Sequence, residues 1–273
     1  MTILELIQAT IPYFSKNNVD SPRLTIELIL AHVLQTTRMK IYLEFDRLLS
    51  PQELDLLRPL VKKRAEGFPL EYTLGVASFA GRLFKVSPDV LIPRPETEIL
   101  LQAVLPLIQE KGLPLLDVGT GSGILAISIA HHYPSLEIWG CDTSEKALAI
   151  AQSNAETAPP IRWHHGDLLS ASPVTQAQWV LANLPYIPSA IIPTLAREVQ
   201  QEPLLALDGG VDGLDLIRKL LPQAKALNAH LALEIWHDQA PLLLPLLKEH
   251  GYSQIQILQD LRQMDRILIA QIY

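Results

Sequence analysis

Cysteine is nearly absent from this sequence: the 273 residues include one, Cys141. A single thiol excludes an intrachain disulfide framework and is typical of proteins kept in a reducing cytosol. It also leaves too few thiolates for a structural zinc site, so we expect no bound metal. We interpret Cys141 itself as a core residue of a strand.

Long apolar runs are absent as well. No stretch reaches the ~18 uninterrupted apolar residues that a membrane-spanning helix needs. Residues 1–14 lack the basic region and the small-residue cleavage site of a secretory signal. We therefore expect a cytoplasmic protein without membrane association. The composition, 48% hydrophobic and 19% charged, is typical of a folded globular chain.

Basic residues are outnumbered, with 22 Lys and Arg against 29 Asp and Glu and a net charge of −7. Proteins that bind nucleic acid usually carry a basic stripe, because neutralisation of phosphates drives their affinity. The densest basic cluster, residues 62–64, spans one helical turn. We interpret it as a solvated helix face, with a local contact to RNA or to an RNA-carrying partner as the alternative. No stable nucleic-acid binding is expected.

The first 75 residues have helical periodicity and predict a small bundle. Asp20 or Ser21 can cap the second helix, with Pro22 at its first position. Ser50 and Glu53 have the spacing of a capping box, which opens the third helix. The three-to-four spacing predicts these inward positions: Leu4, Ile7, Ile11 and Phe14, then Leu24, Leu28 and Val33, then Leu54, Leu57 and Val61. The bundle has no catalytic constellation, so we assign residues 1–75 a binding or scaffolding role.

From about residue 114, short apolar runs alternate with helical stretches, which predicts an α/β fold with a doubly wound parallel sheet. The last two runs are joined only by a short turn. They must pair as an antiparallel hairpin, since a parallel crossover needs a dozen residues or more. We expect a mostly parallel, seven-stranded Rossmann-like sheet with an antiparallel last strand within residues 96–273, after a hairpin-like linker at 76–95. The expected strands are 113–118, 136–141, 161–165, 179–183, 230–235, 252–258 and 266–272.

A glycine-rich loop follows the first strand of this sheet and opens a helix. Its glycines allow a tight turn and a close approach to a ligand, while the helix N-terminus offers free N–H groups. The G-x-G-x-G spacing and the acid before it differ from a dinucleotide loop, where negative charge would repel a pyrophosphate. The alternative is a simple strand-to-helix turn. The candidate cofactor-binding residues in this loop are Asp117, Gly119, Thr120, Gly121, Ser122 and Gly123.

Two further acids end the next two strands. Asp142 can take both hydroxyls of a ribose. Asp167 can accept from an adenine amino group, with Leu168 beside it. Each acid alone would more simply be a cap, but three at successive strand ends indicate an acidic nucleoside site without phosphates. Such a site suits S-adenosylmethionine, whose sulfonium and ammonium groups are cationic, and we expect that cofactor.

The fourth strand ends in Asn183, Leu184, Pro185 and Tyr186, which we predict to be catalytic and to bind the acceptor, with Asn183 also near the donor. An amide nitrogen is a poor nucleophile because its lone pair is delocalised. An Asn oxygen and a backbone carbonyl can each accept one N–H of an –NH₂ group, which points the lone pair at the methyl donor. Tyr186 can pack over a planar amide or base. The alternative is a proline-rich turn.

Several segments resemble the peptide-chain-release-factor glutamine methyltransferases of the HemK/PrmC type. The matching segments are PRLTIEL at 22–28, GFPLEYTLG at 67–75, then Phe79, Gly81 and Phe84, LIPRPETE at 91–98, DVGTGSG at 117–123, EPLLAL at 202–207 and GGVDGL at 209–214. The resemblance covers nearly the whole chain. It implies methylation of the glutamine amide in the Gly-Gly-Gln motif of class I release factors, with the helical domain helping to dock that protein. Separately, we expect a monomer.

Three residues depart from the family pattern. Leu184 stands where the family usually has proline, but Pro185 still restricts the residue before it, so we expect tolerance with some loss of rigidity. Trp236 replaces a usual glycine and is expected to alter packing near the donor pocket. Leu168 stands where relatives often have an aromatic residue, so adenine would rest on an aliphatic side chain.

Other interpretations stay open. An adenine-N6 or other nucleic-acid amino methyltransferase can use a similar acceptor loop, and a donor-binding module without turnover is the second rival. Arg94 and Glu96 either line the substrate or donor entrance or have a structural role, in an ion pair or in forming a turn. His164 and His165 are neighbours on one strand, so their side chains point to opposite faces and cannot share a metal.

Overall fold

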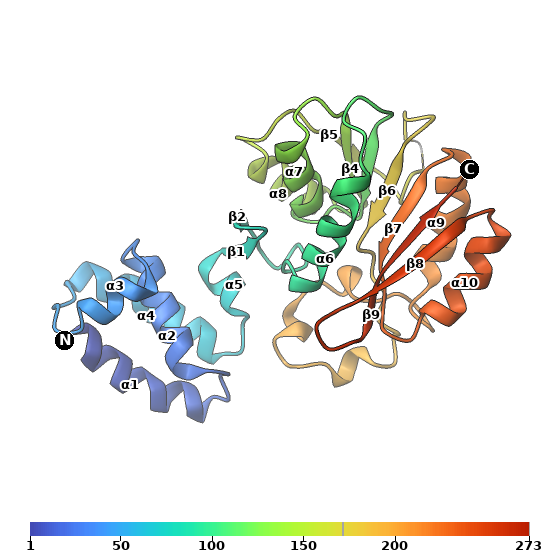
Figure 1. Ribbon diagram of the computed structural model, residues 1–273. Helices are drawn as coiled ribbons and strands as arrows, with labels where there is room; N and C mark the ends of the chain where they lie inside the picture. The colour runs from blue at the N-terminus through green and yellow to red at the C-terminus, as the bar shows by residue number, and fades with distance from the viewer. Residues whose placement is uncertain (171, 273) are drawn as a thin grey trace. The chain divides into compact units, whose positions relative to one another are not determined.

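The computed structural model describes residues 1–170 and 172–272. They fall into two units, each with its own hydrophobic core (Figure 1). The helical unit comprises residues 1–76 and 196–201, and the sheet unit comprises residues 77–195 and those from 202 onward.

The helical unit is the expected bundle. Its helices are α1 (Ile3–Lys16), α2 (Pro22–Val33), α3 (Arg38–Leu43), α4 (Pro51–Ala65) and α5 (Leu70–Leu74), with the short 3-10 turn η3 (Val199–Gln201). The capping box of Ser50 and Glu53 opens α4, as predicted. A second box, Thr2 with Glu5, opens α1.

The predicted inward positions of this bundle are partly wrong. In α2 the buried residues include Ile26, Ile29 and Leu30, whereas Leu24 is 39% exposed. This helix is apolar on several sides, so a three-to-four spacing fits more than one stripe, and packing against α1 and α4 selects between them. Similarly, α1 buries Ile3 and Thr10 rather than Leu4 and Ile11. Of the three inward positions predicted in α4, only Leu57 is fully buried. Ser21 occupies the N-cap of α2 without a side-chain capping bond.

A two-stranded hairpin, β1 (Val76–Phe79) with β2 (Arg82–Lys85), occupies the first half of the expected linker. Phe79 and Phe84 meet edge to face at 6.2 Å between centroids and are buried. They belong to the core of the sheet unit, together with α6 (Pro95–Val104). The segment between the hairpin and α6 is therefore fixed at both ends.

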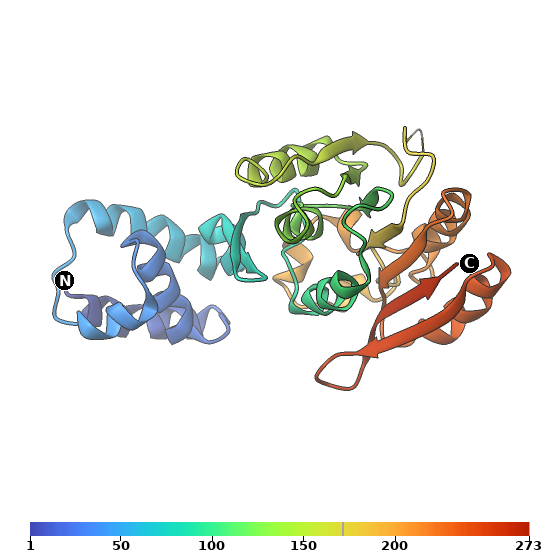
Figure 2. The same cartoon turned by 45° about the horizontal axis from the view of Figure 1, so that its top comes forward.

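Seven strands form the expected mostly parallel sheet, in the order β5-β4-β3-β6-β7-β9-β8. Strand β9 pairs antiparallel with both of its neighbours, β7 and β8. The last strand of the chain therefore lies between them and not at the edge of the sheet (Figure 2). All seven predicted strands are present, with ends that shift by at most two residues. Their bounds are β3 (Leu115–Val118), β4 (Ile138–Asp142), β5 (Arg162–His165), β6 (Trp179–Ala182), β7 (His230–Glu234), β8 (Ser253–Gln259) and β9 (Asp265–Gln271).

Helices cover both faces of the sheet. On one face α6 and α7 (Ile124–His132) pack on alternate strand residues such as Leu115 and Leu181. On the other, α9 (Asp215–Ala226) and α10 (Ala240–Glu249) pack on the residues between them, such as Leu116 and Val180. The remaining elements are α8 (Glu145–Asn154) and the 3-10 turns η1 (Leu105–Leu107), η2 (Ile192–Thr194) and η4 (Leu204–Ala206). Since β3 to β6 are parallel, their carboxyl ends share one edge, where a ligand site is expected.

Candidate active site

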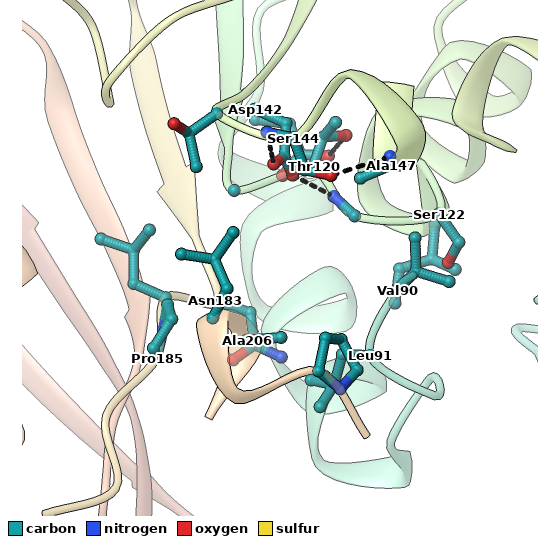
Figure 3. Close-up of a pocket in the computed structure, with 18 of the residues that line it drawn as sticks. Val90, Leu91, Thr120, Ser122, Asp142, Ser144, Ala147, Asn183, Pro185 and Ala206 are labelled. Atoms are coloured by element: carbon teal, nitrogen blue, oxygen red, sulfur yellow. Dashed lines mark hydrogen bonds between the residues drawn. The ribbon is translucent and has the colours of Figure 1, made fainter. Parts of the chain in front are cut away.

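A cavity of about 440 Å³ lies at the carboxyl ends of these strands. Its lining includes the glycine-rich loop, the ends of β4, β5 and β6, the segment before α6 and turn η4. In Figure 3, Thr120, Asp142 and Ser144 gather in one part of the pocket, while Asn183 and Pro185 lie in another. The fold thus brings the two predicted half-sites, donor and acceptor, to one cavity.

The glycine-rich loop turns as its sequence predicts. Gly119, Gly121 and Gly123 all have positive φ, a region that residues with a Cβ rarely adopt. Two amides of the loop, those of Gly119 and Thr120, donate to the carbonyl of Cys141 at the end of β4. The loop is therefore anchored to the neighbouring strand while Gly121 and Ser122 line the cavity.

Asp117 stabilises this loop from inside. Its Oδ2 accepts from the Thr120 hydroxyl at 2.6 Å and from the Ala126 amide, in the first turn of α7, at 3.1 Å. The residue is 2% exposed, and burial raises the pKa of its carboxyl to about 6 despite these two bonds. Its hydrogen bonds go to the loop and the helix, so holding the loop accounts for the carboxylate at this position.

Asp142 presents its carboxylate to the cavity. Its two oxygens accept backbone amides, from Gly121 at 2.9 Å and from Ser144 at 2.9 Å. A carboxylate has about four acceptor positions, so Asp142 keeps acceptor capacity for a ligand hydroxyl. Burial raises the pKa of this carboxyl, opposed by the backbone amides of Ser144, Gly121 and Thr143.

Asp167 and Leu168 follow β5 and both line the cavity. Asp167 is exposed, whereas Leu168 is 7% exposed and has φ of 55°. A non-glycine residue in the left-handed region costs of order 1–3 kcal/mol and persists only where its surroundings fix it. Leu168 belongs to the sheet core through its side chain, which supplies that constraint.

The acceptor loop follows β6, and its first three residues, Asn183, Leu184 and Pro185, line the cavity. Leu184 is 4% exposed and packs toward the donor loop: a methyl group on Gly119 would come within 3.0 Å of Leu184 Cδ2. The leucine at this position therefore also provides an apolar contact between the donor and acceptor loops.

For the methyl transfer that the family resemblance implies, we expect Leu184→Pro to raise the rate by about two- to fivefold, because proline restricts the backbone that carries the carbonyl at position 184. The measurement is the single-turnover rate. Leu184→Ala is the control: it also removes the buried side chain but adds no restraint, and should not be faster than the wild type. A Leu184→Pro rate equal to or below wild type would contradict the rigidity argument.

Tyr186 lies beside the cavity and is not part of its lining. Its hydroxyl donates to Glu234 Oε1 at 2.9 Å, and its ring is 6.0 Å from that of Trp236. Burial and the Glu234 carboxylate raise the pKa of the hydroxyl well above its usual value, so it remains a donor. Trp236 was expected near the donor pocket; the structure places it against the acceptor loop, with Arg266 over its ring.

Two buried polar residues behind this loop were not among the predicted site residues. Thr97, in the first turn of α6, is 0% exposed, and Glu234, at the end of β7, is 1% exposed. Asn183 Nδ2 donates to the Thr97 hydroxyl at 3.0 Å, and that hydroxyl donates to Glu234 Oε2 at 2.7 Å. Thr97 occurs in the segment 91–98 that resembles the family, whereas Glu234 lies in none of the matching segments, and nothing in their spacing indicates that they meet.

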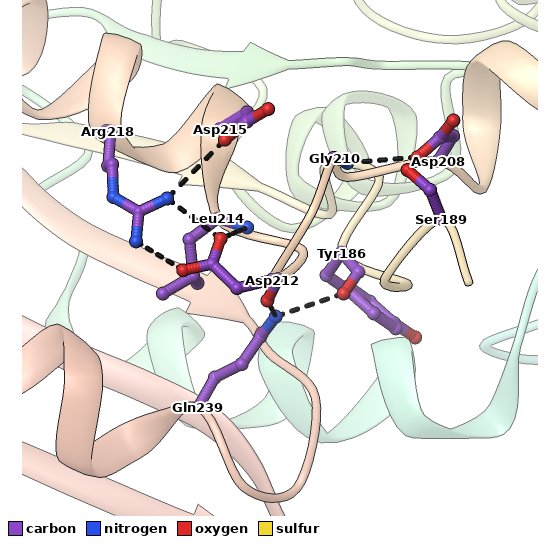
Figure 4. Close-up of polar contacts among 9 residues, drawn as sticks. All are labelled: Tyr186, Ser189, Asp208, Gly210, Asp212, Leu214, Asp215, Arg218 and Gln239. Carbon is purple, nitrogen blue, oxygen red and sulfur yellow. Dashed lines mark hydrogen bonds and ion pairs between the residues drawn. The ribbon is translucent and has the colours of Figure 1, made fainter. Parts of the chain in front are cut away.

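The backbone of the acceptor loop is held by the glycine-rich segment 209–213 and by Gln239. Gln239 is 2% exposed, and its Nε2 donates to the carbonyls of Tyr186 at 3.0 Å and Asp212 at 3.1 Å (Figure 4). The Gly209 amide donates to the Ile187 carbonyl at 2.9 Å. A side chain on Gly213 would overlap the Tyr186 carbonyl, so this close approach requires glycine.

Arg94 and Glu96 separate in the structure. Arg94 lines the cavity and forms an ion pair with Glu202, which also accepts the Ile92 amide at 3.0 Å. Arg94 is thus both a structural partner and a cavity residue. Glu96 is half-buried on α6 and outside the cavity lining.

The neighbouring histidines have different partners, as their strand position predicts: His164 contacts the Ser170 carbonyl and His165 the Thr143 carbonyl. Within residues 1–170 and 172–272, no cluster of His, Cys, Asp or Glu could hold a metal ion. No helix in the described part of the chain is long and apolar enough to cross a membrane. Cys141 is a buried core residue of β4, as interpreted.

Family comparisons match both parts of the chain. Residues 5–75 match the PrmC N-terminal domain and residues 115–203 a methyltransferase domain. The chain is 36% identical to the release factor glutamine methyltransferase of Moorella thermoacetica, over 99% of this chain and 98% of the relative. It is also 36% identical to the protein of the same name from Chlorobaculum tepidum, over 97% and 95% of the two chains.

Solved structures share the fold at low identity. The hMettl16 catalytic domain in complex with MAT2A 3'UTR hairpin 6 matches with a TM-score of 0.59 and 11% identity, over 79% of this chain and 92% of that chain. The T. thermophilus 16S rRNA N2 G1207 methyltransferase, in complex with AdoMet and guanosine, matches with a TM-score of 0.53 and 18% identity, over 72% and 50%. At these identities the likeness establishes the methyltransferase fold alone.

Proposed function

Because the chain belongs to the release factor glutamine methyltransferase family, we propose that it methylates the glutamine amide in the Gly-Gly-Gln motif of class I peptide chain release factors, with S-adenosylmethionine as donor. The observation that carries this proposal is the shared cavity, which has the Asp142 carboxylate in one part and the Asn183 amide in another. A methyl donor and an amide acceptor can therefore meet in it.

In the donor half, Asp142 would hold the ribose hydroxyls with the acceptor positions that its two backbone amides leave open. Asp167 would accept from the adenine amino group, with the base against Leu168. The carboxylates of the cavity favour a cationic ligand. Asp117 would act mainly through the shape of the loop.

In the acceptor half, Asn183 Oδ1 and the carbonyl of Leu184 would each accept one N–H of the substrate amide. The nitrogen would then form a bond to the methyl carbon as the S–CH₃ bond breaks, with S-adenosylhomocysteine as the leaving group. The proton that the nitrogen loses would pass to solvent water, which leaves a neutral methylated amide. Pro185 restricts the backbone that carries the carbonyl, so positioning supplies much of the catalysis. Since Tyr186 is bonded to Glu234 and packs beside Trp236, we assign its ring to the wall of the acceptor site, and Arg94 to the entrance.

Asp142→Ala should weaken S-adenosylmethionine binding about 10- to 100-fold, because two hydrogen bonds to a charged acceptor are lost. Calorimetry measures this directly. Asp89→Ala is the matched control: this acid also lines the cavity but is paired with Lys146, so its removal should change affinity far less. Unchanged affinity in Asp142→Ala would mean that the ribose binds elsewhere.

We further propose that the helical unit docks the release factor. Large exposed apolar side chains on this unit, including Met39 (70%), Leu43 (79%) and Leu48 (71%), support a protein partner. We also propose that the enzyme is a cytoplasmic monomer without stable nucleic-acid binding, as its net charge of −7 favours.

The deciding experiment mixes the protein, S-adenosylmethionine and a purified class I release factor, and maps added methyl groups by peptide mass spectrometry. A single methyl group on the glutamine of Gly-Gly-Gln is the expected result. Release factor with that glutamine replaced by alanine is the control and should gain no methyl group. Methylation at another site, or of nucleic acid only, would favour the rival amino methyltransferase.

A further inference from the structure

The Thr97 hydroxyl lies between two polar groups from distant parts of the chain, Glu234 Oε2 at 2.7 Å and Asn183 Nδ2 at 3.0 Å. Burial raises the pKa of the Glu234 carboxyl, and the hydrogen bonds from Thr97 and Tyr186 oppose that shift. In its ionised form the carboxylate can only accept, so the Thr97 hydroxyl donates to it. Its one proton is then used, and its oxygen can only accept from Asn183. The Asn183 nitrogen must therefore face Thr97, which leaves the amide oxygen pointing away from it.

We infer that Thr97 and Glu234 are positioning residues, which fix the Asn183 side-chain amide with its oxygen toward the acceptor. The inference rests on the proposed glutamine methylation and deepens it. The two ends of an Asn amide have nearly the same shape, so sterics alone do not select one orientation. A hydrogen-bond network with a fixed donor and acceptor at each step selects one orientation of the amide.

Glu234 is suited to this role because both of its oxygens are engaged. Oε2 accepts from Thr97, and Oε1 accepts from the Tyr186 hydroxyl at 2.9 Å. The carboxylate is 1% exposed, so water does not compete for these bonds. One buried acid thus orients two side chains of the acceptor loop, Asn183 through Thr97 and Tyr186 directly.

The reversed amide would be unproductive. Asn183 would then present N–H groups to the –NH₂ of the substrate, and two donors cannot bond to each other. The substrate nitrogen would lose one of the two acceptors that direct its lone pair. Binding of the remainder of a large protein substrate would be nearly unaffected, so the defect should appear in kcat and not in KM.

Thr97→Val tests this relay, since valine keeps the shape of threonine and lacks the hydroxyl. We expect single-turnover methylation of the release factor to slow about 10- to 100-fold. The KM for the release factor and the calorimetric Kd for S-adenosylmethionine should remain near wild type. Thr97→Ser retains the hydroxyl and should recover most of the lost rate. Thermal unfolding of both variants reports whether the fold survives.

A double variant separates positioning from general damage. If Thr97 acts through Asn183, Thr97→Val should add little further loss in an Asn183→Ala background. Equal rates in the Val and Ser variants, or a full additional loss in the double variant, would overturn the relay and leave glutamine methylation standing. A wild-type protein that transfers no methyl group to the release factor would overturn the proposed function and the relay with it.

Discussion

Asn183→Ala should lower the rate of methyl transfer by about 100- to 1,000-fold, which is the range found when one preorganised hydrogen-bonding group is removed from an active site. The substrate nitrogen would keep the carbonyl of Leu184 but lose the second acceptor, so its lone pair would no longer be held on the line to the methyl group. The measurement is the single-turnover rate of methyl transfer at saturating concentrations of the donor and the release factor.

The same variant should retain much of its affinity for S-adenosylmethionine. The proposed donor contacts of Asp142, Asp167 and the glycine-rich loop belong to other strand ends, so calorimetry of Asn183→Ala serves as the internal control. Near-normal turnover in this variant would refute the proposed mechanism. A large loss of donor affinity with unchanged turnover at saturation would instead assign Asn183 to the cofactor.

The acidic residues at the ends of the donor-site strands could be predicted from the sequence, because each follows a local pattern of apolar residues. Asp142 and Asp167 each follow a short apolar run, and parallel strands bring their carboxyl ends to one edge. The final hairpin followed from the short turn between β8 and β9, which leaves no room for a crossover. The structure adds that β9 is inserted between β7 and β8, a choice that no local pattern specifies.

The positioning network could not be derived in the same way. Thr97 and Asn183 are 86 residues apart, and Thr97 and Glu234 are 137 apart. Each has an ordinary local explanation, a polar residue in a first helical turn and an acid at a strand end. Only the packing of α6 against β7 makes one buried cluster of them. Gln239 is similar, since its bonds to Tyr186 and Asp212 depend on how α10 begins after β7.

Amphipathic periodicity failed where a helix is apolar on more than one side. In α2, Leu24 and Ile26 both fit a helical stripe, and the structure buries Ile26 because that side meets α1 and α4. The alternation of apolar runs with helical stretches, by contrast, correctly places α7 and α8 between strands of the sheet. Periodicity locates a helix more securely than it orients one.

Gly213→Ala should destabilise the sheet unit by about 3 kcal/mol and also slow methyl transfer, because two penalties combine at this position. Gly213 has φ of 77°, which a residue with a Cβ adopts only with strain. In addition, the new methyl group would overlap the Tyr186 carbonyl and crowd Gln239 Nε2, at 2.5 Å. The acceptor loop must move to make room, and with it the carbonyl of Leu184. Denaturant unfolding and the single-turnover rate measure the two effects.

Gly81→Ala is the control that separates the backbone strain at positive φ from the steric overlap of the new methyl group. Gly81 belongs to the same unit and has nearly the same φ, 74°, but a Cβ there would meet no heavy atom within 4 Å. The Gly81→Ala variant should therefore lose only the free energy of unfolding that comes from backbone strain, about 1–2 kcal/mol. Its rate of methyl transfer should stay at the wild-type value. If Gly213→Ala lost no more stability than Gly81→Ala and methylated the release factor at the wild-type rate, the segment 209–213 would not be what holds the acceptor loop. A larger loss in both measurements would make the shape of this loop, and not only its side chains, a requirement for catalysis.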